Sequence, residues 1–515
     1  MSDTLQTINE QPDAVKRIVI VGGGSAGWMT AAALSSLLPQ NAVQITLIES
    51  EQIGTIGVGE ATIPDVINFN SMLGISETEF LKATNGTFKL GIEFVNWGRV
   101  GDSYFHPFGT HGVDMNGIDF HQFWLRYQRD NPGSVVEEFS LSAIAAKRNK
   151  FVLPEGDPRS VLSHIRYAYH FDATAYAKYL RRYAEQRGVQ RVEGKVVDVS
   201  LKSDTGFISD VELESGQSVS GDLFFDCSGF RSLLLGKALD VDFKDWSHWL
   251  PCDTAQTVAC ERTGALRPYT VSTAKRAGWQ WRIPTQHRTG NGHIYSSALM
   301  SDDDAIESLL ADLDGPAMAT PRKIKFRTGH RTKFWEKNCI GIGLSSGFLE
   351  PLESTSLFLI QEGISKFISL YPTADMPESV RSEYNRQITK KFEQVRDFII
   401  LHYKATQRDD SEFWNYCRTM SVPDSLTQKI ELFREAGRIF RYEDELFSKP
   451  SWIAVLLGQN MQPKSVDPII GALPAAQIAK SLVSMKAAMD SATEKMPTHE
   501  AFLKNYAWAN EPALS

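Results

Sequence analysis

The sequence has little cysteine and no long apolar segment, and both shortages narrow the class of protein. Five cysteines are scattered through 515 residues, and no two of them form a CxxC pair. So sparse and odd a number favours free thiols in a reducing cytoplasm over disulfides or a zinc site. No apolar run approaches the roughly 20 residues that are needed to span a bilayer. We therefore expect a cytoplasmic protein that holds no metal and enters no membrane.

Basic clusters, internal repeats and low-complexity tracts are also missing. The formal net charge is −8, and no run of Lys and Arg exceeds a few residues. A nucleic acid or an acidic membrane surface is therefore not an expected partner. Residues 1–16 are polar and lack the apolar stretch of a secretion signal, so they predict a short disordered lead. With 42% apolar residues, the chain is large enough for a sizeable core.

The start of the chain predicts a nucleotide-binding βαβ unit. A strand at residues 18–21 is followed by a glycine turn, a helix at residues 28–38 and a strand at residues 43–48 that leads into Glu49. The turn reads Gly22-Gly23-Gly24-Ser25-Ala26-Gly27-Trp28, which contains GxGxxG. Glycines let the backbone approach a pyrophosphate closely, and the helix amides then face its negative charge. An acid after the second strand is placed to bond a ribose hydroxyl.

A later segment favours FAD over a nicotinamide. Phe225-Asp226-Cys227-Ser228-Gly229 joins an apolar strand to a glycine turn, and it resembles the late strand of FAD monooxygenase-type flavoproteins. The alternative is an ordinary connection between a strand and a turn. The sequence has no second GxGxxG that could hold NAD(P)H. A flavoprotein without its own nicotinamide site needs electrons from elsewhere.

The rest of the chain predicts an α/β fold in which the nucleotide-binding elements are interleaved with a second sheet. Strands are expected at residues 86–97, within 190–223, through 250–300 and at 340–344, and helices at 171–188, 355–370 and 377–403. We expect an interleaved FAD-binding and substrate-sheet module over residues 17–375. A mainly helical subdomain over residues 376–515 would complete the substrate pocket.

Lys89 is the first candidate catalytic residue. Alternation within residues 86–97 places it opposite the face that carries Phe88, Leu90 and Ile92. A lysine in such a position is ordinarily solvated. The functional alternative is an amine that meets a small electrophile in a cavity, where desolvation lowers its pKa and raises its reactivity.

The second candidate site lies where a helix begins, after Phe348-Leu349-Glu350-Pro351-Leu352-Glu353-Ser354-Thr355. The carboxylate of Glu353 could act as a base, and Glu350 competes with it for this role. The free amides of Thr355 and Ser356 could hold an anion such as halide. The simpler interpretation is a helix cap in which Ser354 is the N-cap residue.

A tryptophan pair marks a third segment, Gly278-Trp279-Gln280-Trp281-Arg282-Ile283-Pro284. Trp279 and Trp281 face the same side of a strand, because side chains alternate along it. Aromatic residues at this spacing usually form a core or the wall of a cavity.

Together these segments resemble the flavin-dependent halogenases, of which the tryptophan halogenases are the best-known branch. The match runs nearly end to end and rests on residues 22–28, 57–64, 278–284 and 348–355. The 278–284 segment, WxWxIP, separates halogenases from related hydroxylating monooxygenases. The resemblance implies an α/β fold like that of FAD-dependent monooxygenases, with a Rossmann-type FAD-binding core, a substrate-side β-sheet and a mostly helical C-terminal part.

The resemblance also implies a reaction and its partners. FADH2 from a separate NAD(P)H-dependent flavin reductase would react with O2, and chloride or bromide would be oxidised to hypohalous acid. The oxidant would pass through a tunnel to Lys89, beside a small, electron-rich aromatic substrate. The oligomeric state is left open, and a homodimer is one candidate.

The same match assigns site residues. Lys89 and Glu353 take the catalytic positions, and the backbone amides of Thr355 and Ser356 take the halide position. Three ring side chains are expected against the substrate: His106, Phe108 and Trp452. The residues expected at the flavin are Gly22, Gly23, Gly24, Ser25, Ala26, Gly27, Glu49, Ser50, Ala61, Val196, Asp226, Gly229, Leu344 and Leu357.

One segment departs from the family. Tryptophan-specific members carry an acidic and aromatic segment with Phe-Trp and paired Tyr, which grips the amine and carboxylate of the amino acid. The comparable stretch here, residues 442–452, is shorter and lacks both pairs. An indole or another electron-rich arene is therefore expected at least as readily as free tryptophan. Two alternatives are an FAD-dependent aromatic hydroxylase and a flavin-binding protein without turnover, and only a halogenase requires Lys89.

Overall fold

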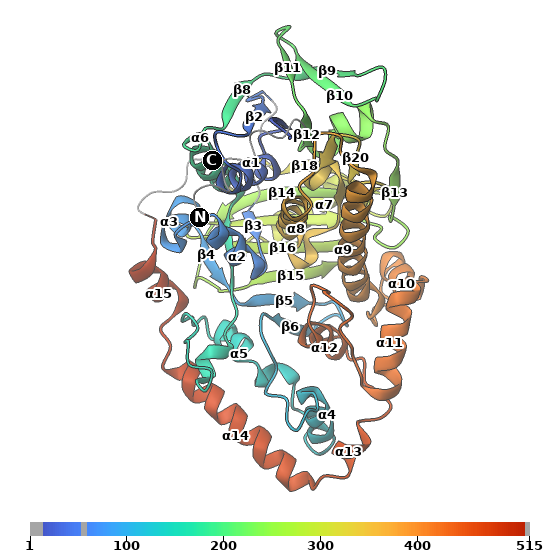
Figure 1. Cartoon of the computed structure of the whole chain (residues 1–515). Helices are drawn as coiled ribbons and strands as arrows, with labels where there is room; N and C mark the ends of the chain where they lie inside the picture. The colour runs from blue at the N-terminus through green and yellow to red at the C-terminus, as the bar shows by residue number, and fades with distance from the viewer. Residues whose placement is uncertain (1–13, 53–58, 510–515) are drawn as a thin grey trace.

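A parallel sheet organises the first half of the fold in this computed structural model, which describes residues 14–52 and 59–509 (Figure 1). It has six strands in the order β20-β21-β12-β1-β2-β8, all parallel except β20. Their bounds are β1 Arg17–Val21, β2 Gln44–Glu49, β8 Gln190–Glu193, β12 Leu223–Asp226, β20 Trp335–Glu336 and β21 Cys339–Gly341. Ile18, Ile20 and Leu47 are fully buried, as expected for strands covered on both faces.

A second, seven-stranded sheet lies beside the first, in the order β18-β14-β17-β16-β15-β5-β6. Its pairs are antiparallel except for β5 and β15, which run parallel. The strands are β5 Gly91–Val95, β6 Ser103–Pro107, β14 Thr254–Glu261, β15 Thr270–Lys275, β16 Gly278–Pro284, β17 Arg288–Tyr295 and β18 Arg322–Lys325. The hairpin of β5 and β6 thereby joins strands that begin only at Thr254, because β5 pairs with β15.

Three smaller sheets complete the strand inventory of the described residues. Their orders are β3-β7-β4, β11-β10-β9 and β13-β19-β22. Their strands are β3 Gly59–Ala61, β4 Thr87–Lys89, β7 Ala168–Asp172, β9 Val196–Leu201, β10 Ile208–Leu213, β11 Ser218–Ser220, β13 Phe243–Asp245, β19 Gly329–Arg331 and β22 Gly347–Phe348. β3 also packs against β16 and β17, so this small sheet links the N-terminal region to the large sheet.

Helices cover both large sheets (Figure 1). In the N-terminal half they are α1 Ser25–Leu37, α2 Asp65–Met72, α3 Glu77–Ala83, α4 Phe120–Asp130, α5 Leu141–Lys147 and α6 Ala173–Glu185. Later come α7 Asp302–Ala311, α8 Ser356–Ser369, α9 Glu378–Lys404, α10 Glu412–Thr419, α11 Asp424–Ala436, α12 Lys449–Gly458, α13 Pro468–Gly471, α14 Ala475–Glu494 and α15 His499–Tyr506. α1 packs on α6 and α8, whereas α14 returns to pack on α4 and α5.

Most elements expected from the sequence are present, with one instructive difference. The strand expected at residues 86–97 is two strands, because the chain changes sheet at Leu90: β4 pairs with β7, and β5 pairs with β6 and β15. At the N-terminus, Ala14 forms a bridge to Thr373 and Val15 is buried. The rest of the predicted lead, residues 1–13, and residues 57–58 of the second motif lie outside the described residues.

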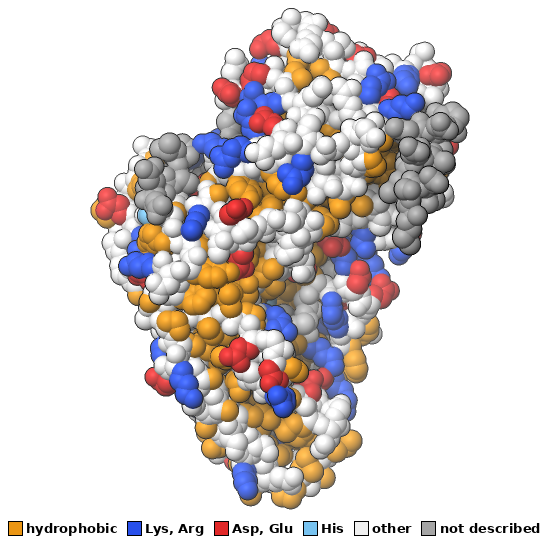
Figure 2. Space-filling view, turned by 60° about the vertical axis from the view of Figure 1, so that its left-hand side comes forward, with side chains coloured by type: hydrophobic (Ala, Val, Ile, Leu, Met, Phe, Trp, Pro, Cys, Tyr) orange, Lys and Arg blue, Asp and Glu red, His pale blue; other side chains and the backbone are white. Residues whose placement is uncertain are grey.

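Acidic and basic side chains are interspersed on the face shown in Figure 2, and neither sign forms a continuous patch there. Among the described residues, no helix is long and apolar enough to cross a bilayer. No group of three or more metal-ligating side chains occurs in the described part of the chain.

Candidate active site

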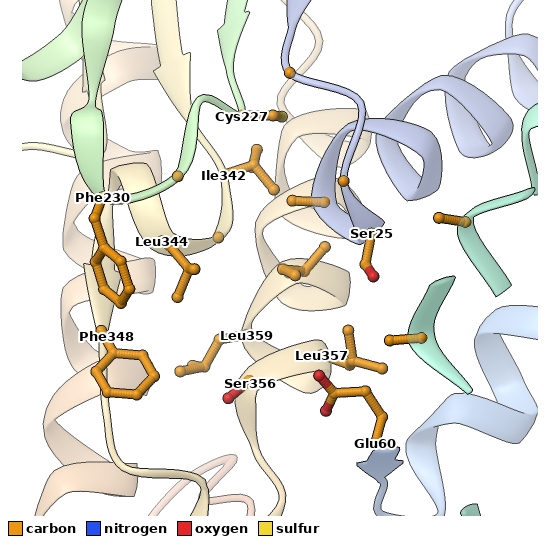
Figure 3. A pocket seen from close by; sticks show the side chains of 18 of the residues that line it. Ser25, Glu60, Cys227, Phe230, Ile342, Leu344, Phe348, Ser356, Leu357 and Leu359 are labelled. Atoms are coloured by element: carbon orange, nitrogen blue, oxygen red, sulfur yellow. The ribbon is translucent and has the colours of Figure 1, made fainter. Parts of the chain in front are cut away.

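A cavity of about 850 Å³ lies where the parallel sheet meets the large sheet. The β1–α1 turn, the residues after β12 and the start of α8 line one part of it (Figure 3). Residues of β14 to β17 form another wall. Trp279 and Trp281 both line this wall, with ring centroids 5.9 Å apart. The tryptophan pair predicted as core or wall is therefore a cavity wall.

The glycine turn is shaped partly for packing and partly for a ligand. A Cβ atom at Gly22 would lie 2.2 Å from the carbonyl oxygen of Cys227, and the φ of Gly22 is +119°. This close approach requires glycine. At Gly24, by contrast, a Cβ atom would meet nothing within 4 Å. Gly24 therefore borders open cavity at the N-terminus of α1, where backbone amides are suited to a pyrophosphate.

Most residues expected at the flavin line this cavity. They are Gly22, Gly23, Gly24, Ser25, Ala26, Glu49, Ser50, Ala61, Val196, Gly229, Leu344 and Leu357. The backbone cradle and the acid after β2 thus fit a dinucleotide such as FAD. Glu49 is held in place, since it accepts a hydrogen bond from Trp28 Nε1 at 3.2 Å and pairs with Arg181 and Arg191.

Gly27 and Asp226 were also expected at the flavin, but the structure gives both a packing role. A Cβ atom at Gly27 would lie 1.8 Å from the carbonyl oxygen of Gly22. The buried carboxylate of Asp226 accepts hydrogen bonds from Ser228 and from the amides of Leu234 and Leu235. Neither residue lines the cavity. Both shape the turns that carry the cavity-lining residues, and their expected place at the flavin stays a prediction.

Lys89 is fully buried at the end of β4, and the solvated-lysine interpretation is wrong. Its Nζ donates hydrogen bonds to the carbonyl oxygen of Thr62 at 3.0 Å and to the hydroxyl of Ser354 at 2.8 Å. The Nζ lies 5.0 Å from the ring centroid of Phe108. Burial lowers the pKa of Lys89 to about 7, although nearby Glu353 opposes that shift. At neutral pH a large share of the amine is therefore unprotonated and nucleophilic.

Ser354 connects Lys89 to the cavity. Its φ of 59° is left-handed, and α8 begins only at Ser356, so Ser354 is not the N-cap residue. Instead, its hydroxyl accepts the hydrogen bond from Lys89, and Ser354 itself lines the cavity. Lys89 does not line the cavity, so Ser354 stands between the two compartments.

Glu353 is enclosed by two histidines. Its carboxylate lies 3.0 Å from His106 Nδ1 and 2.7 Å from His402 Nε2, and all three side chains are buried. Burial acts to raise the pKa of Glu353, but the two histidines outweigh it and hold the pKa at about 2. Glu353 is therefore ionised at neutral pH and can accept a proton. We call Lys89, His106, Phe108, Glu353 and His402 the lysine chamber.

His402 was not found from the sequence. Its Nδ1 lies 2.9 Å from the carbonyl oxygen of Phe398, so this nitrogen carries a proton. Its Nε2 faces Glu353 as an ion-pair contact rather than an aligned hydrogen bond. This Nε2 lies 2.7 Å from the carboxylate of Glu353, and the contact helps to hold the pKa of that carboxyl low. The only signal in the sequence was a histidine within the apolar end of the helix expected at residues 377–403.

Glu350, the competitor for the role of Glu353, is engaged elsewhere. Its carboxylate accepts hydrogen bonds from Trp279 Nε1 at 2.9 Å and from the Tyr403 hydroxyl at 2.5 Å. Burial raises the pKa of Glu350 to about 7. Glu350 therefore ties the tryptophan wall on β16 to α9, and the residue beside Lys89 is Glu353.

Of the three ring side chains expected against the substrate, the fold places His106 and Phe108 in the lysine chamber and Trp452 outside it. His106 contacts Glu353, and Phe108 lies beside Lys89, as above. Trp452 is buried at the start of α12, where its ring lies 5.0 Å from that of Phe398. Phe447 stacks on Phe398 at 3.8 Å, and both of these rings also neighbour His106. Phe398 thus lies between His106 and Trp452, and Phe447 stacks beside it.

The start of α8 has unused hydrogen-bonding groups. Within the described residues, no acceptor bonds the amide of Thr355 or Ser356. The hydroxyl of Thr355 is buried without a partner in the same part of the chain. Ser356 lines the cavity. Free amides at the positive end of a 14-residue helix are suited to an anion.

A Rossmann-type cavity beside a buried lysine fits an enzyme that binds a flavin. Comparison with known proteins identifies the family: the chain belongs to the family described as Tryptophan halogenase, whose model matches residues 17–475. The tryptophan 6-halogenase of Streptomyces toxytricini is 36% identical over 473 residues, which cover 86% of this chain and 89% of that protein.

Two solved structures are similar over almost their whole length. The flavin-dependent halogenase Xcc4156 of Xanthomonas campestris is 44% identical, with a TM-score of 0.93 over 97% of this chain and 100% of that one. The flavin-dependent halogenase BrvH of Brevundimonas sp. is also 44% identical, with a TM-score of 0.92 over 96% and 99% of the two chains.

The protein is therefore a flavin-dependent halogenase that uses FADH2, halide and O2. Members of this family normally receive reduced flavin from a separate reductase. This membership favours a halogenase over the hydroxylase and over the flavin-binding protein without turnover. A homodimer stays a prediction.

Proposed function

We propose that this enzyme halogenates an indole, or a similar electron-rich arene, with Lys89 and Glu353 as its catalytic residues. FADH2 held in the cavity would give two electrons to O2, and the halide would give the other two as it takes one oxygen atom to become hypohalous acid, with the second oxygen atom leaving as water. The amides of Thr355 and Ser356 hold the halide at the start of α8. Chloride and bromide both suit this site, because backbone amides recognise charge rather than ion size.

Lys89 receives the oxidant from the cavity through Ser354. Its amine, unprotonated in part at neutral pH, either forms a haloamine or hydrogen-bonds the hypohalous acid. Enclosure by Phe108, Thr62 and Ser354 keeps water away from the amine. This fully buried lysine beside the flavin cavity is the observation that carries the proposal.

Glu353 then removes the proton that the arene loses when halogen is added. His106 and His402 keep its carboxylate ionised and fix its direction. The carboxylate cannot swing toward solvent, because it is fully buried. A positioned base of this kind contributes roughly 10²- to 10⁴-fold to a rate.

The substrate class follows from the segment beside Trp452. Tryptophan halogenases are among the relatives, yet residues 442–452 lack the Phe-Trp and Tyr-Tyr pairs that grip an amino acid. In that segment Glu445 is already paired, at 2.9 Å, with Lys429. We therefore favour an indole without ammonium and carboxylate groups over free tryptophan.

Mass spectrometry of products tests the proposal. Purified protein is given FAD, a flavin reductase with NADH, O2 and either chloride or bromide, with indole, tryptophan or a phenol as substrate. A halogen isotope pattern on indole, lost in Lys89→Ala while FAD binding and hydrogen peroxide formation persist, is the expected result. Halogenated tryptophan in excess of halogenated indole would overturn the substrate class, and an active Lys89→Ala would overturn the mechanism.

A further inference from the structure

Glu60 is an unpaired acid in the flavin cavity that the steps above leave unused. It lies at the centre of β3 and lines the cavity. Figure 3 shows its carboxyl pointing toward the start of α8, where Ser356 and Leu357 lie. Among the described residues, none forms a hydrogen bond or an ion pair with this carboxyl. The other acids of this wall differ, since Glu49 and Glu51 are both paired with Arg191.

Charged and titratable groups on the elements that pack against β3 are engaged with other partners. On β16 and β17, Arg282 bonds the carbonyl oxygen of Asp312, and His293 faces the carbonyl oxygen of Ala305. Arg181, which lines the same cavity, pairs with Glu49. On β7, which pairs with β3, Asp172 is bound by Arg288, and His170 lies between the hydroxyls of Thr87 and Thr270. Lys89 on β4 is bound to Thr62 and Ser354. Asp65, on the helix that follows β3, faces Lys391 and Arg441.

The side chain of Glu60 is half-buried in this cavity, and desolvation is what shifts its pKa. Burial raises the pKa of Glu60 to about 7, and no neighbouring charge offsets it. The carboxyl of Glu60 is therefore mostly neutral below about pH 7 and mostly ionised above it. An acid that changes charge near neutral pH thus faces the helix terminus that is suited to an anion.

We propose that Glu60 couples anion binding in this cavity to the uptake of one proton, which it holds while halide occupies the start of α8. A carboxylate repels a nearby halide, because both carry negative charge. A protonated carboxyl does not, and its O–H can donate a hydrogen bond to the ion. The proposal rests on the halide site of the proposed function and adds the group that regulates it.

Chloride affinity as a function of pH is the direct test. Chlorine NMR line broadening is measured on the enzyme loaded with oxidised FAD, between about pH 6 and pH 9. The affinity of the wild type is expected to fall above neutral pH, by up to about tenfold per pH unit for each proton taken up. Glu60→Gln has the same shape and no charge, so its affinity is expected to depend less on pH. Glu60→Asp keeps a carboxyl and should restore the dependence.

Lys89 titrates in the same range and needs its own control. Its pKa is also about 7, and loss of its positive charge would weaken anion binding as pH rises. The comparison is therefore repeated with Lys89→Met present in both proteins. The slope due to Glu60 is the part that Glu60→Gln removes in both backgrounds. Equal slopes with and without Glu60 would overturn the proposal.

Infrared difference spectroscopy of the wild type provides a second measurement that needs no variant. Chloride added at about pH 8 should produce the C=O band of a protonated carboxyl, and no such band would also overturn the proposal. The product assay distinguishes failure of this proposal from failure of the proposed function. Halogenated product with a slope unchanged in Glu60→Gln refutes only the role of Glu60. A Glu60-dependent slope without halogenated product refutes only the proposed function.

Discussion

The flavin cavity and the lysine chamber lie on either side of Ser354, and they are built in different ways. The cavity is open, about 850 Å³ in volume, and its contacts come largely from backbone turns and apolar side chains. The chamber is closely packed, and it buries one lysine, one glutamate and two histidines. The comparison shows how recognition and reactivity are divided: backbone geometry suits a large cofactor, whereas buried charges tune a single amine.

Replacing Lys89 should break the chamber while leaving the cavity intact, and it is the largest expected effect. Lys89→Met keeps most of the buried volume but removes the amine, so product formation should fall about a thousandfold or more. Lys89→Arg keeps the charge but cannot offer an unprotonated amine at neutral pH, and it should also be inactive. Product is measured by mass spectrometry and FAD binding by fluorescence. FAD affinity should be unchanged, because Lys89 does not line the cavity.

Replacing Glu353 tests the charge of the chamber rather than its shape. Glu353→Gln should slow product formation about a hundredfold, because a neutral amide cannot accept the proton. Glu350→Gln is the matched control: it lies three residues earlier and is equally buried, but it bonds Trp279 and Tyr403. Rates are compared at saturating halide. An equal or larger loss in the Glu350 variant would mean that the catalytic base has been misassigned.

Two glycines of the β1–α1 turn are expected to have different roles: Gly22 in stability and Gly24 in FAD binding. Gly22→Ala should lower the free energy of unfolding by about 2–3 kcal/mol, because alanine is strained at a positive φ and its Cβ would collide with Cys227. Gly24→Ala should leave stability within about 0.5 kcal/mol of the wild type, since open space surrounds the site. It should instead weaken FAD binding several-fold. Thermal unfolding without FAD and titration with FAD separate the two effects.

The sequence predicted the flavin cavity better than it predicted the lysine chamber. Backbone-determined features were accessible: the glycine turn, β1, β2 and the wall of Trp279 and Trp281 all lie where local pattern placed them. The lysine chamber depends on pairings between distant segments. Alternation around Lys89 identified two faces of a strand, but burial came from β7 on one edge and from the change of sheet at Leu90.

His402 illustrates the second limit. The helix pattern at residues 377–403 showed an apolar face, but nothing in the pattern says what that face meets. In the fold, α9 brings His402 to Glu353, 49 positions earlier in the chain. A motif supplied the identity of Glu353, whereas only the tertiary structure supplies the partner that keeps it ionised.

Replacing His402 should produce the smallest change in rate and the clearest change in pH dependence. With His402→Gln, one of the two groups that hold the pKa of Glu353 at about 2 is lost, and burial is opposed less strongly. The pKa of Glu353 should rise. Because the ionised carboxylate is the active form, activity is lost as pH falls through this pKa. The acid limb of the pH–rate profile, which in the wild type follows Lys89 with its pKa of about 7, should therefore steepen and move to higher pH as protonation of Glu353 adds to it, while the rate at neutral pH falls about tenfold or less.

His293→Gln is the matched control for this prediction. His293 is also buried, but its Nδ1 faces the carbonyl oxygen of Ala305, away from the lysine chamber. Its substitution should leave the acid limb in place. His106→Gln should shift the limb at least as far as His402→Gln, since His106 contributes most to the lowering of the pKa of Glu353. An acid limb that stays fixed in both chamber variants would show that Glu353 does not owe its ionisation to the histidines, and that another group sets the pH dependence of the reaction.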